Sequence, residues 1–155
     1  MIDGRIVAIY IARAKGAAME QLREAQINAG QGIVGDRYFT GTGTFSGNTQ
    51  GPGDREITLI EAEEIDRFNA QQGYAFNHGE LRRNIITRGV RLNELIDKEF
   101  QIGPVRLKGI RLCEPCAHLA GLVAPQVVKA MVHRAGLRAC ILTNGMIREN
   151  DPITG

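Results

Sequence analysis

The sequence has no tryptophan and few aromatic residues, and it lacks any apolar run long enough to span a bilayer. Its formal net charge is only +2, which provides no strong attraction to nucleic acid or to an anionic membrane. The first residues also lack the basic-then-apolar pattern of a secretion signal. These absences predict a cytoplasmic protein with neither nucleic acid nor membrane among its partners.

Cysteine is also scarce, with three residues among 155. In a reducing cytoplasm these would be free thiols, so metal binding or catalysis competes with plain burial as their use. The rest of the composition is ordinary, because 43% hydrophobic and 23% charged residues are typical of a soluble globular protein. A chain of this length can bury a core without disulfides, and we expect a single domain over residues 1–155.

Short strands dominate the predicted secondary structure. Alternation on both sides of Gly103-Pro104 predicts one hairpin, and Asn144-Gly145 is a strong signal for a second two-residue hairpin. Segments rich in β-branched or alternating apolar residues predict further strands at 5–12, 57–60, 84–87 and 137–142.

Helices and loops account for the remainder. Apolar Ala62, Ile65 and Phe68 share one face of a predicted helix that follows residue 60. A second helix is predicted from Pro125 and would end before Gly136. Residues 13–39 give mixed signals typical of a loop, and the stretch at 40–53, rich in Gly, Thr and Ser, predicts a lid or binding loop. Many short strands without regular βαβ alternation favour a mainly β fold, a β-barrel with a few peripheral helices.

The most informative stretch surrounds two cysteines at residues 105–118. The apolar alternation changes phase at Gly109, which predicts a bulge. If Ile110 and Leu112 face the core beyond it, Cys113 faces the other side. Glu114-Pro115 cannot easily continue a strand, so Cys116 is expected on a turn at its end. A thiol placed there near arginines can ionise, and the thiolate is the form that binds soft metals.

Several interpretations of the cysteines compete. Cys140 lies in an apolar strand segment and is expected to be simply buried. A structural zinc site could use Cys113 and Cys116 with His118, His133 or Cys140, although one Cys-x-x-Cys pair alone is weak evidence. A thioredoxin-like dithiol is weaker still, because the βαβ context is missing.

Two clusters contain arginine beside a polar partner. Arg83 and Asn84 precede a predicted strand, where a guanidinium can grip phosphate bidentately and an amide can pair with a heterocycle. The alternative for this cluster is a solvated arginine pair ahead of the strand. Asp36-Arg37 follows Gly35, and its alternative is a simple ion pair in a turn.

Taken together, these pieces resemble the MOSC domain, found at the C-terminus of molybdenum cofactor sulfurases and as stand-alone bacterial proteins. The resemblance runs in order from Ile33 to Pro152. It rests on Gly-Asp-Arg-Tyr at 35–38, Leu-Arg-Arg-Asn-Ile at 81–85, Leu95 followed by Phe-Gln-Ile-Gly at 100–103, Cys-Glu-Pro-Cys at 113–116, and Gly-Leu-Arg-Ala at 136–139 with a closing hairpin to Asp151.

The resemblance implies a MOSC-type β-barrel that binds molybdenum cofactor (molybdopterin). The family's required cysteine, which ligates molybdenum or carries sulfur, matches Cys116, so Cys116 is the predicted catalytic residue and metal ligand, with Cys113 as the second candidate. Arg83 and Asn84 match the residues that would anchor the pterin and its phosphate, and Arg37 matches a further anchor.

The resemblance also implies an activity, with two departures. Cofactor-reducing relatives often carry a lysine-serine pair after the first strand, where this chain has Ala-Arg-Ala-Lys-Gly at 12–16. The pyridoxal phosphate domain of true cofactor sulfurases has no counterpart, so pyridoxal phosphate is not expected.

Three alternative functions are therefore expected for this chain. The first is an oxidoreductase that reduces N-hydroxylated small molecules and takes electrons from a donor protein. The second is a non-catalytic molybdenum cofactor or sulfur (persulfide) carrier that serves a cofactor-accepting enzyme, and the missing lysine-serine pair slightly favours it. The third is a zinc-stabilised binding module.

Overall fold

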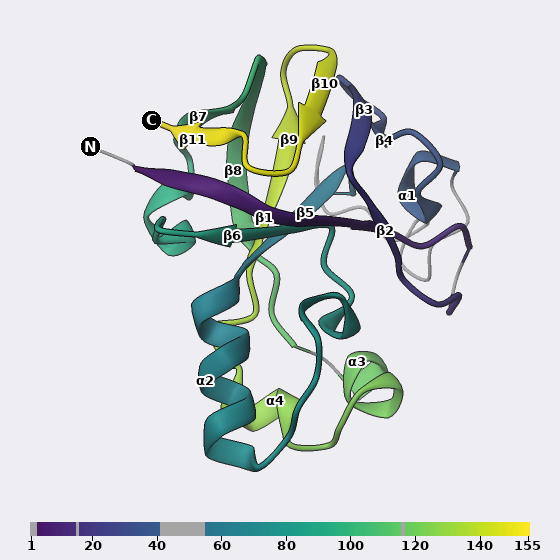
Figure 1. Ribbon diagram of the computed structural model, residues 1–155, viewed down its shortest axis with the longest axis vertical. Helices are drawn as coiled ribbons and strands as arrows, with labels where there is room; N and C mark the ends of the chain where they lie inside the picture. The colour runs from purple at the N-terminus through teal and green to yellow at the C-terminus, as the bar shows by residue number, and fades with distance from the viewer. Residues whose placement is uncertain (1–2, 15, 41–54, 116) are drawn as a thin grey trace.

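The computed structural model describes residues 3–14, 16–40, 55–115 and 117–155. Within these residues, seven strands close into a barrel, with the helices gathered mainly below it in Figure 1. Neighbouring strands run antiparallel except for one parallel pair, β5 with β6. The strands around the barrel are β1 (Gly4–Ile11), β11 (Pro152–Thr154), β7 (Glu99–Ile102), β8 (Val105–Leu112), β9 (Leu137–Ile141), β5 (Ile57–Glu61) and β6 (Ile85–Arg88), which pairs with β1 again. The mainly β class, the opening strand and the hairpin at 99–107 are therefore confirmed.

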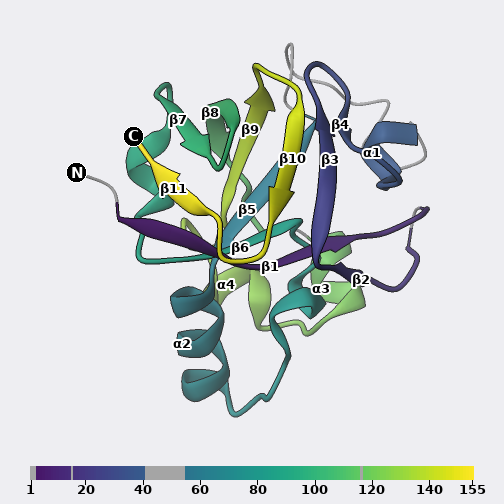
Figure 2. The same cartoon turned by 45° about the horizontal axis from the view of Figure 1, so that its top comes forward.

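A second, three-stranded sheet lies beside the barrel, as Figure 2 shows. It consists of β10 (Gly145–Arg148), β3 (Glu24–Asn28) and β4 (Gly32–Ile33), while β2 (Glu20–Leu22) pairs with the end of β1. The sequence prediction of a loop throughout 13–39 was wrong for these short strands.

The predicted hairpin at Asn144-Gly145 was also wrong, because β10 pairs with β3 and not with β9. Neither residue has the positive φ that a type I′ turn needs. The Asn144 side chain instead accepts a hydrogen bond from the backbone N–H of Ala29, at 2.7 Å. A tertiary partner for the asparagine thus replaces the local turn, and the chain crosses to another sheet.

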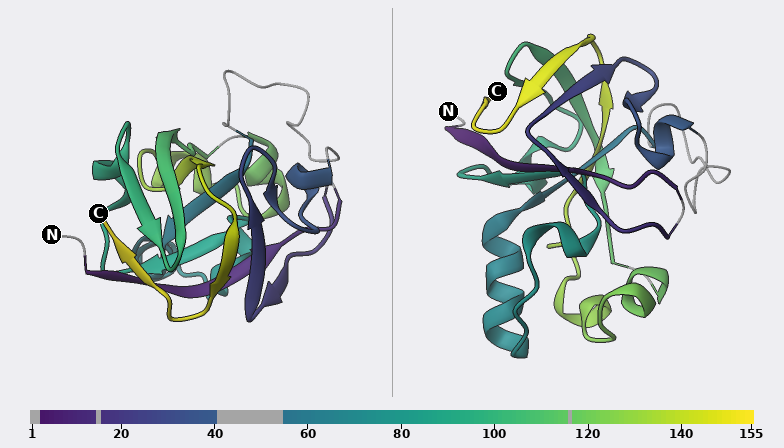
Figure 3. Two further views of the ribbon diagram at one scale, coloured as in Figure 1. Left: turned by 90° about the horizontal axis from the view of Figure 1, so that it is seen from above. Right: turned by 45° about the vertical axis from the view of Figure 1, so that its right-hand side comes forward.

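The helices are short, and most lie on one side of the barrel, as the right-hand view in Figure 3 shows. The predicted helix after residue 60 is α2 (Ala62–Gln72), which ends at Gly73 with φ 73°. The predicted second helix is shorter than expected, because α4 spans only Val127–Ala130. The others are α1 (Arg37–Thr40), α3 (Ala117–Leu122), and the 3-10 helices η1 (His78–Leu81) and η2 (Leu92–Leu95). In the described part of the chain, none of these helices has the length and apolar character to cross a bilayer.

Two apolar cores explain why β5 is buried along its whole length. Ile57 and Leu59 point into the barrel interior, which forms the larger core. Ile60 points outward and packs in a second core with Ile65 and Phe68 of α2. A strand covered on both faces carries apolar residues on both of them, as Ile57, Leu59 and Ile60 do here.

The predicted irregularity at Gly109 is confirmed by a register shift between Gly109 and Arg111 in the β8–β9 pairing. A Cβ at Gly109 would lie 2.1 Å from the carbonyl oxygen of Leu95, so only glycine fits there. Beyond it, the expected orientation was wrong: Cys113 is 2% exposed, whereas Ile110 and Leu112 are half-exposed. The backbone N–H of Cys113 donates to the carbonyl of Gly136, which holds the end of β8 against the start of β9.

Candidate functional site

A buried carboxylate organises the polar residues beside β1. Asp36 is fully buried, and its Oδ1 accepts hydrogen bonds from the backbone N–H of Ala12 at 3.0 Å and from Arg37 Nη1 at 3.2 Å. Its Oδ2 accepts from the backbone N–H of Tyr38 at 3.3 Å. Arg37 is itself 6% exposed, so this pair is much more than a turn ion pair at the surface. Because both charges are buried, removing either would leave the other uncompensated.

Asn84 connects that carboxylate to the barrel wall. Its Oδ1 accepts from both the backbone N–H and the hydroxyl of Thr58, each at 3.1 Å. Its Nδ2 donates to the carbonyl of Tyr10 at 3.0 Å and to Asp36 Oδ1 at 3.3 Å. The amide therefore has its full set of four hydrogen bonds within the protein. We call Asp36, Arg37, Thr58 and Asn84 the framework network.

Arg83 lies next in sequence but has different partners. Its Nε donates to the carbonyl of Ala135 and its Nη2 to the carbonyl of Cys113, both at 2.8 Å. The side chain is 8% exposed. It therefore ties the end of β8 to the turn before β9, in which Gly136 has φ 115°. Whether Arg83 also touches a ligand stays a prediction.

Of the two remaining cysteines, the structure describes only Cys140. Cys116 lies outside the described residues, as does most of the predicted lid at 40–53. Cys140, expected to be buried, is only half-buried, and burial together with the nearby Glu56 carboxylate raises the pKa of its thiol. Among the described residues, no group of three or more His, Cys, Asp or Glu side chains is arranged to hold a metal ion.

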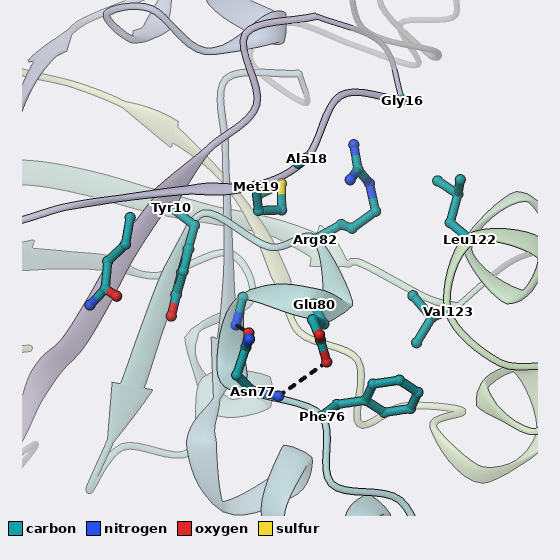
Figure 4. Close-up of a pocket in the computed structure, with 12 residues that line it drawn as sticks. Tyr10, Gly16, Ala18, Met19, Phe76, Asn77, Glu80, Arg82, Leu122 and Val123 are labelled. Atoms are coloured by element: carbon teal, nitrogen blue, oxygen red, sulfur yellow. Dashed lines mark hydrogen bonds between the residues drawn. The ribbon is translucent and has the colours of Figure 1, made fainter.

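A pocket of about 610 Å³ opens next to the framework network. Four segments form it: β1 with the β1–β2 connection, the residues before η1, η1 itself with Arg82, and the end of α3 (Figure 4). Its walls are apolar at Met19, Phe76, Leu122 and Val123. The remaining lining residues are Tyr10, Gly16, Ala18, Gln21, Asn77, Gly79, Glu80 and Arg82.

Arg82 is the cationic residue of this pocket, and sequence reasoning passed it over in favour of Arg83. Its backbone has φ 65°, a left-handed conformation that is unusual for arginine. The side chain reaches toward Gly16 in Figure 4, and its Nη1 donates to the carbonyl of Ala17 at 2.8 Å. Among the described residues, Nε and Nη2 of Arg82 have no hydrogen-bond partner.

The framework network positions this arginine. Arg37 Nη2 donates to the backbone carbonyl of Arg82 at 3.2 Å. Burial lowers the pKa of the Arg82 guanidinium from its ordinary value, and repulsion by Arg37 adds to the shift. A partly desolvated cation with free donors is well suited to bind an anion. The sequence contained one signal for it, the Arg-Arg pair, but not the direction of each side chain.

The structure thus places the four described candidates in two pairs. Arg37 and Asn84 meet through Asp36, and Arg83 and Cys113 meet through a carbonyl. None of the four lines the pocket, which they adjoin through Tyr10 and Arg82.

Comparison with known proteins identifies the family. The MOSC domain family matches residues 43–154, well over half of the chain. The chain belongs to the MOSC domain family. A search of curated proteins found no match to this MOSC chain.

Solved structures share the fold. The YuaD protein of Bacillus subtilis has a TM-score of 0.83 at 19% identity, covering 98% of this chain and 94% of that one. YiiM of Geobacillus stearothermophilus has a TM-score of 0.72 at 16% identity, with 97% and 74% covered. YiiM of Escherichia coli has a TM-score of 0.69 at 14% identity, with 97% and 68% covered. At these identities the likeness establishes the MOSC fold alone.

Proposed function

We propose that this MOSC chain binds molybdenum cofactor in the pocket beside Arg82 and serves as a reductase of N-hydroxylated small molecules. The observation that carries the proposal is the Arg82 guanidinium, which lines a pocket of about 610 Å³ and whose Nε and Nη2 have no partner in the described part of the chain. That volume lies within the usual range for sites that hold a small molecule or cofactor.

The pocket chemistry fits such a group. A phosphate needs a cation, and Arg82 presents two donors in fork geometry. A pterin needs hydrogen-bonding groups at its edge, and Gln21 and Asn77 place amides in the lining. Its flat faces need apolar walls, and Met19 and Phe76 provide them. The framework network and Arg83 then act behind the wall and hold its backbone in place.

Cys116 is the proposed metal ligand. The chain that precedes it is held where Arg83 grips the carbonyl of Cys113. The chain that follows it forms α3, whose last residue Leu122 lines the pocket. The thiolate is the cysteine form that binds a soft metal.

In the proposed reaction the N–O bond of the substrate breaks, and the oxygen leaves as water after uptake of two electrons and two protons. The electrons come from an electron-donor protein. When bound, the cofactor supplies a metal centre that exchanges two electrons. The chain itself supplies the Cys116 thiolate, the Arg82 anchor for an anionic group, and apolar walls that exclude water from the substrate.

Molybdenum content is the first test. The protein should be produced in a host that makes the cofactor, and molybdenum per chain measured by mass spectrometry. Cys116→Ser and Arg82→Met should each lose most of the metal. The matched controls are Cys140→Ser and Arg148→Met, whose arginine makes an exposed ion pair with Glu24. Equal molybdenum in all four variants would overturn the proposed site.

Reductase activity is the second test, with 6-hydroxylaminopurine as substrate and a chemical electron donor. We expect turnover by the loaded wild-type protein and none by Cys116→Ser. Bound molybdenum without turnover would contradict the reductase and favour a carrier that passes cofactor to another enzyme.

A further inference from the structure

The segment that leads into Cys116 is held at its backbone. The N–H of Cys113 donates to the carbonyl of Gly136, and the carbonyl of Cys113 accepts from Arg83, each at 2.8 Å. Pro115 follows, and its ring fixes its own φ. Backbone contacts and proline together restrict the chain just before the proposed metal ligand.

Glu114 adds a side-chain contact to these backbone contacts. Its Oε1 accepts from the backbone N–H of His133 at 2.7 Å, and its Oε2 lies 2.6 Å from Nδ1 of the same histidine. Both carboxylate oxygens therefore bind one residue, which lies 19 positions further along the chain. We call this two-point contact between Glu114 and His133 the carboxylate clamp.

His133 has an unusual backbone conformation at this contact. Its φ is 61°, in the left-handed region that residues with a Cβ seldom adopt. Such a conformation persists only where the surroundings fix it. Here the N–H and Nδ1 of His133 contact Glu114, and its carbonyl accepts from Asn93 Nδ2 at 2.9 Å.

The loop that carries this histidine is fixed to both apolar cores. Met131 and Ala135, on either side of the histidine, are 1% and 2% exposed and belong to the second core. Asn93 lies in η2 next to Leu92, which is fully buried in the barrel core. The carboxylate of Glu114 therefore binds to a rigid part of the molecule.

Stability alone does not explain the carboxylate clamp. The side chains of Glu114 and His133 are 42% and 69% exposed, and contacts between exposed charged groups contribute little to folding. The left-handed backbone at His133 adds a cost. The clamp does restrain the chain two residues before Cys116. Metal ligands need such support, because neighbouring groups that orient a ligand strengthen metal binding.

We propose that Glu114 is a positioning residue for Cys116. Its contact with His133 fixes the chain before the cysteine, so that the thiolate is presented to the metal in one orientation. Glu114 acts only through Cys116 and touches neither metal nor substrate. That Cys116 binds a metal rests on the proposed function, whereas the restraint on its position does not.

Three substitutions dissect the clamp. Glu114→Ala removes both contacts. Glu114→Gln keeps them, because the amide oxygen can accept from the N–H of His133 and the amide nitrogen can donate to a neutral imidazole. His133→Gly keeps the backbone N–H and tolerates the left-handed φ, but it lacks the ring.

Glu24→Ala is the matched control. Glu24 is also exposed, at 53%, and its carboxylate bonds to the Arg148 side chain at 2.9 Å on β10, in the three-stranded sheet. The thermal unfolding midpoints of Glu114→Ala and Glu24→Ala should be alike, since each loses one exposed contact.

The first measurement uses metal-free protein, so it does not depend on the cofactor. A nitroxide label is attached to Cys116 in a Cys140→Ser background, in which Cys113 is too buried to react. Electron paramagnetic resonance then reports how freely the label moves on the nanosecond timescale.

Label motion should increase most in Glu114→Ala and less in His133→Gly. It should match the parent protein in Glu114→Gln and in Glu24→Ala. Unchanged motion in Glu114→Ala, or an equal increase in Glu114→Gln, would overturn the positioning role.

Molybdenum content is the second measurement, on protein from a host that makes the cofactor. Glu114→Ala should retain about tenfold less molybdenum than the wild type, which is the usual effect of losing a group that orients a metal ligand. Glu114→Gln and Glu24→Ala should retain as much as the wild type. The rescue by glutamine separates positioning by hydrogen bonds from an effect of charge alone.

The two measurements distinguish this proposal from the proposed function. Label motion that depends on Glu114, in a wild type that never retains molybdenum, would keep the positioning role and reject the proposed cofactor site. Molybdenum retained equally by the wild type and by Glu114→Ala would do the reverse.

Discussion

The framework network and the pocket wall use the same kinds of residue in opposite ways. Asn84 has all its side-chain polar atoms bonded within the protein, and Arg37 bonds through both of its Nη atoms. Arg82 and Glu80 line the pocket, and each has side-chain polar atoms without a partner among the described residues. The two groups touch through the carbonyl of Arg82. Buried polar groups with complete hydrogen bonding therefore stabilise the wall of the site. Polar groups at the pocket surface with incomplete hydrogen bonding can donate to or accept from a ligand.

The largest expected effect comes from removing the amide of the framework network. Asn84→Ala would leave the backbone N–H of Thr58 and the carbonyl of Tyr10 buried without partners. We expect a loss of about 3 kcal/mol in the free energy of unfolding, measured by urea denaturation. Asn93→Ala is the control, because Asn93 makes one bond at the surface. Equal losses in the two variants would refute the distinction between framework and surface.

The adjacent arginines offer the sharpest comparison. Arg83→Met would orphan the carbonyls of Ala135 and Cys113, at a cost of about 2 kcal/mol. Arg82→Met should cost less than about 1 kcal/mol, because the side chain makes only one described hydrogen bond and is half-exposed. Urea denaturation measures both. Greater destabilisation by Arg82→Met would reverse the roles that the geometry assigns.

The two described cysteines should also differ in how much stability is lost when each is replaced by serine. Cys113→Ser places a hydroxyl in a 2% exposed position and should cost on the order of 1 to 2 kcal/mol. Cys140→Ser should cost less than about 0.5 kcal/mol, because a half-buried hydroxyl can reach water. Thermal unfolding of both variants in reducing buffer measures the difference. The unfolding midpoint of Cys140→Ser should be higher than that of Cys113→Ser.

The smallest expected effect is a change in how stability depends on pH. Burial raises the pKa of Glu56 above its ordinary value of 4.5. Hydrogen bonds from the backbone N–H groups of Ile141 and Gly30 act in the opposite direction but do not cancel this rise. The folded state therefore binds this proton more tightly than the unfolded state does. Its stabilising contribution is complete below pH 4.5 and is lost as pH rises through the folded pKa. Glu56→Gln should flatten the stability profile just above pH 4.5.

An exposed carboxylate provides the opposite slope. Hydrogen bonding from His78, then from Arg88, lowers the pKa of Asp66 below its ordinary value of 3.8. Its contribution is present above that pH and is lost as pH falls through the folded pKa. Asp66→Asn should therefore flatten the acidic side of the profile. Identical profiles for both variants would contradict the assignment of opposite shifts.

Local patterns in the sequence predicted much of the barrel. The runs that became β1, β5 and β9 were recognisable because β-branched residues cluster there, and the shift at Gly109 was recognisable because alternation changes phase. The three-stranded sheet was missed. Its strands are short, and β4 has only two residues. β3 pairs with β10 more than a hundred residues away, and no local periodicity encodes such pairing.

The ligand-binding roles of Arg37, Arg83 and Asn84 stay predictions from the sequence. The fold joins Arg37 and Asn84 through Asp36, whereas Arg83 bonds to the carbonyls of Ala135 and Cys113. The sequence did not distinguish Arg82 from Arg83, because both are arginines beside the same strand. Only the left-handed backbone at Arg82 and the buried carbonyls near Arg83 separate a pocket residue from an internal tie.

By itself, the sequence determined the mainly β class, the helix α2 and the membership in the MOSC family, since these follow from local residue patterns and from motifs in order. The tertiary structure alone decided which polar atoms are satisfied and which remain open. A hydrogen bond depends on two groups meeting within about 3 Å, and in this chain the partners of Asn84 come from three separate segments that only the folded barrel brings together.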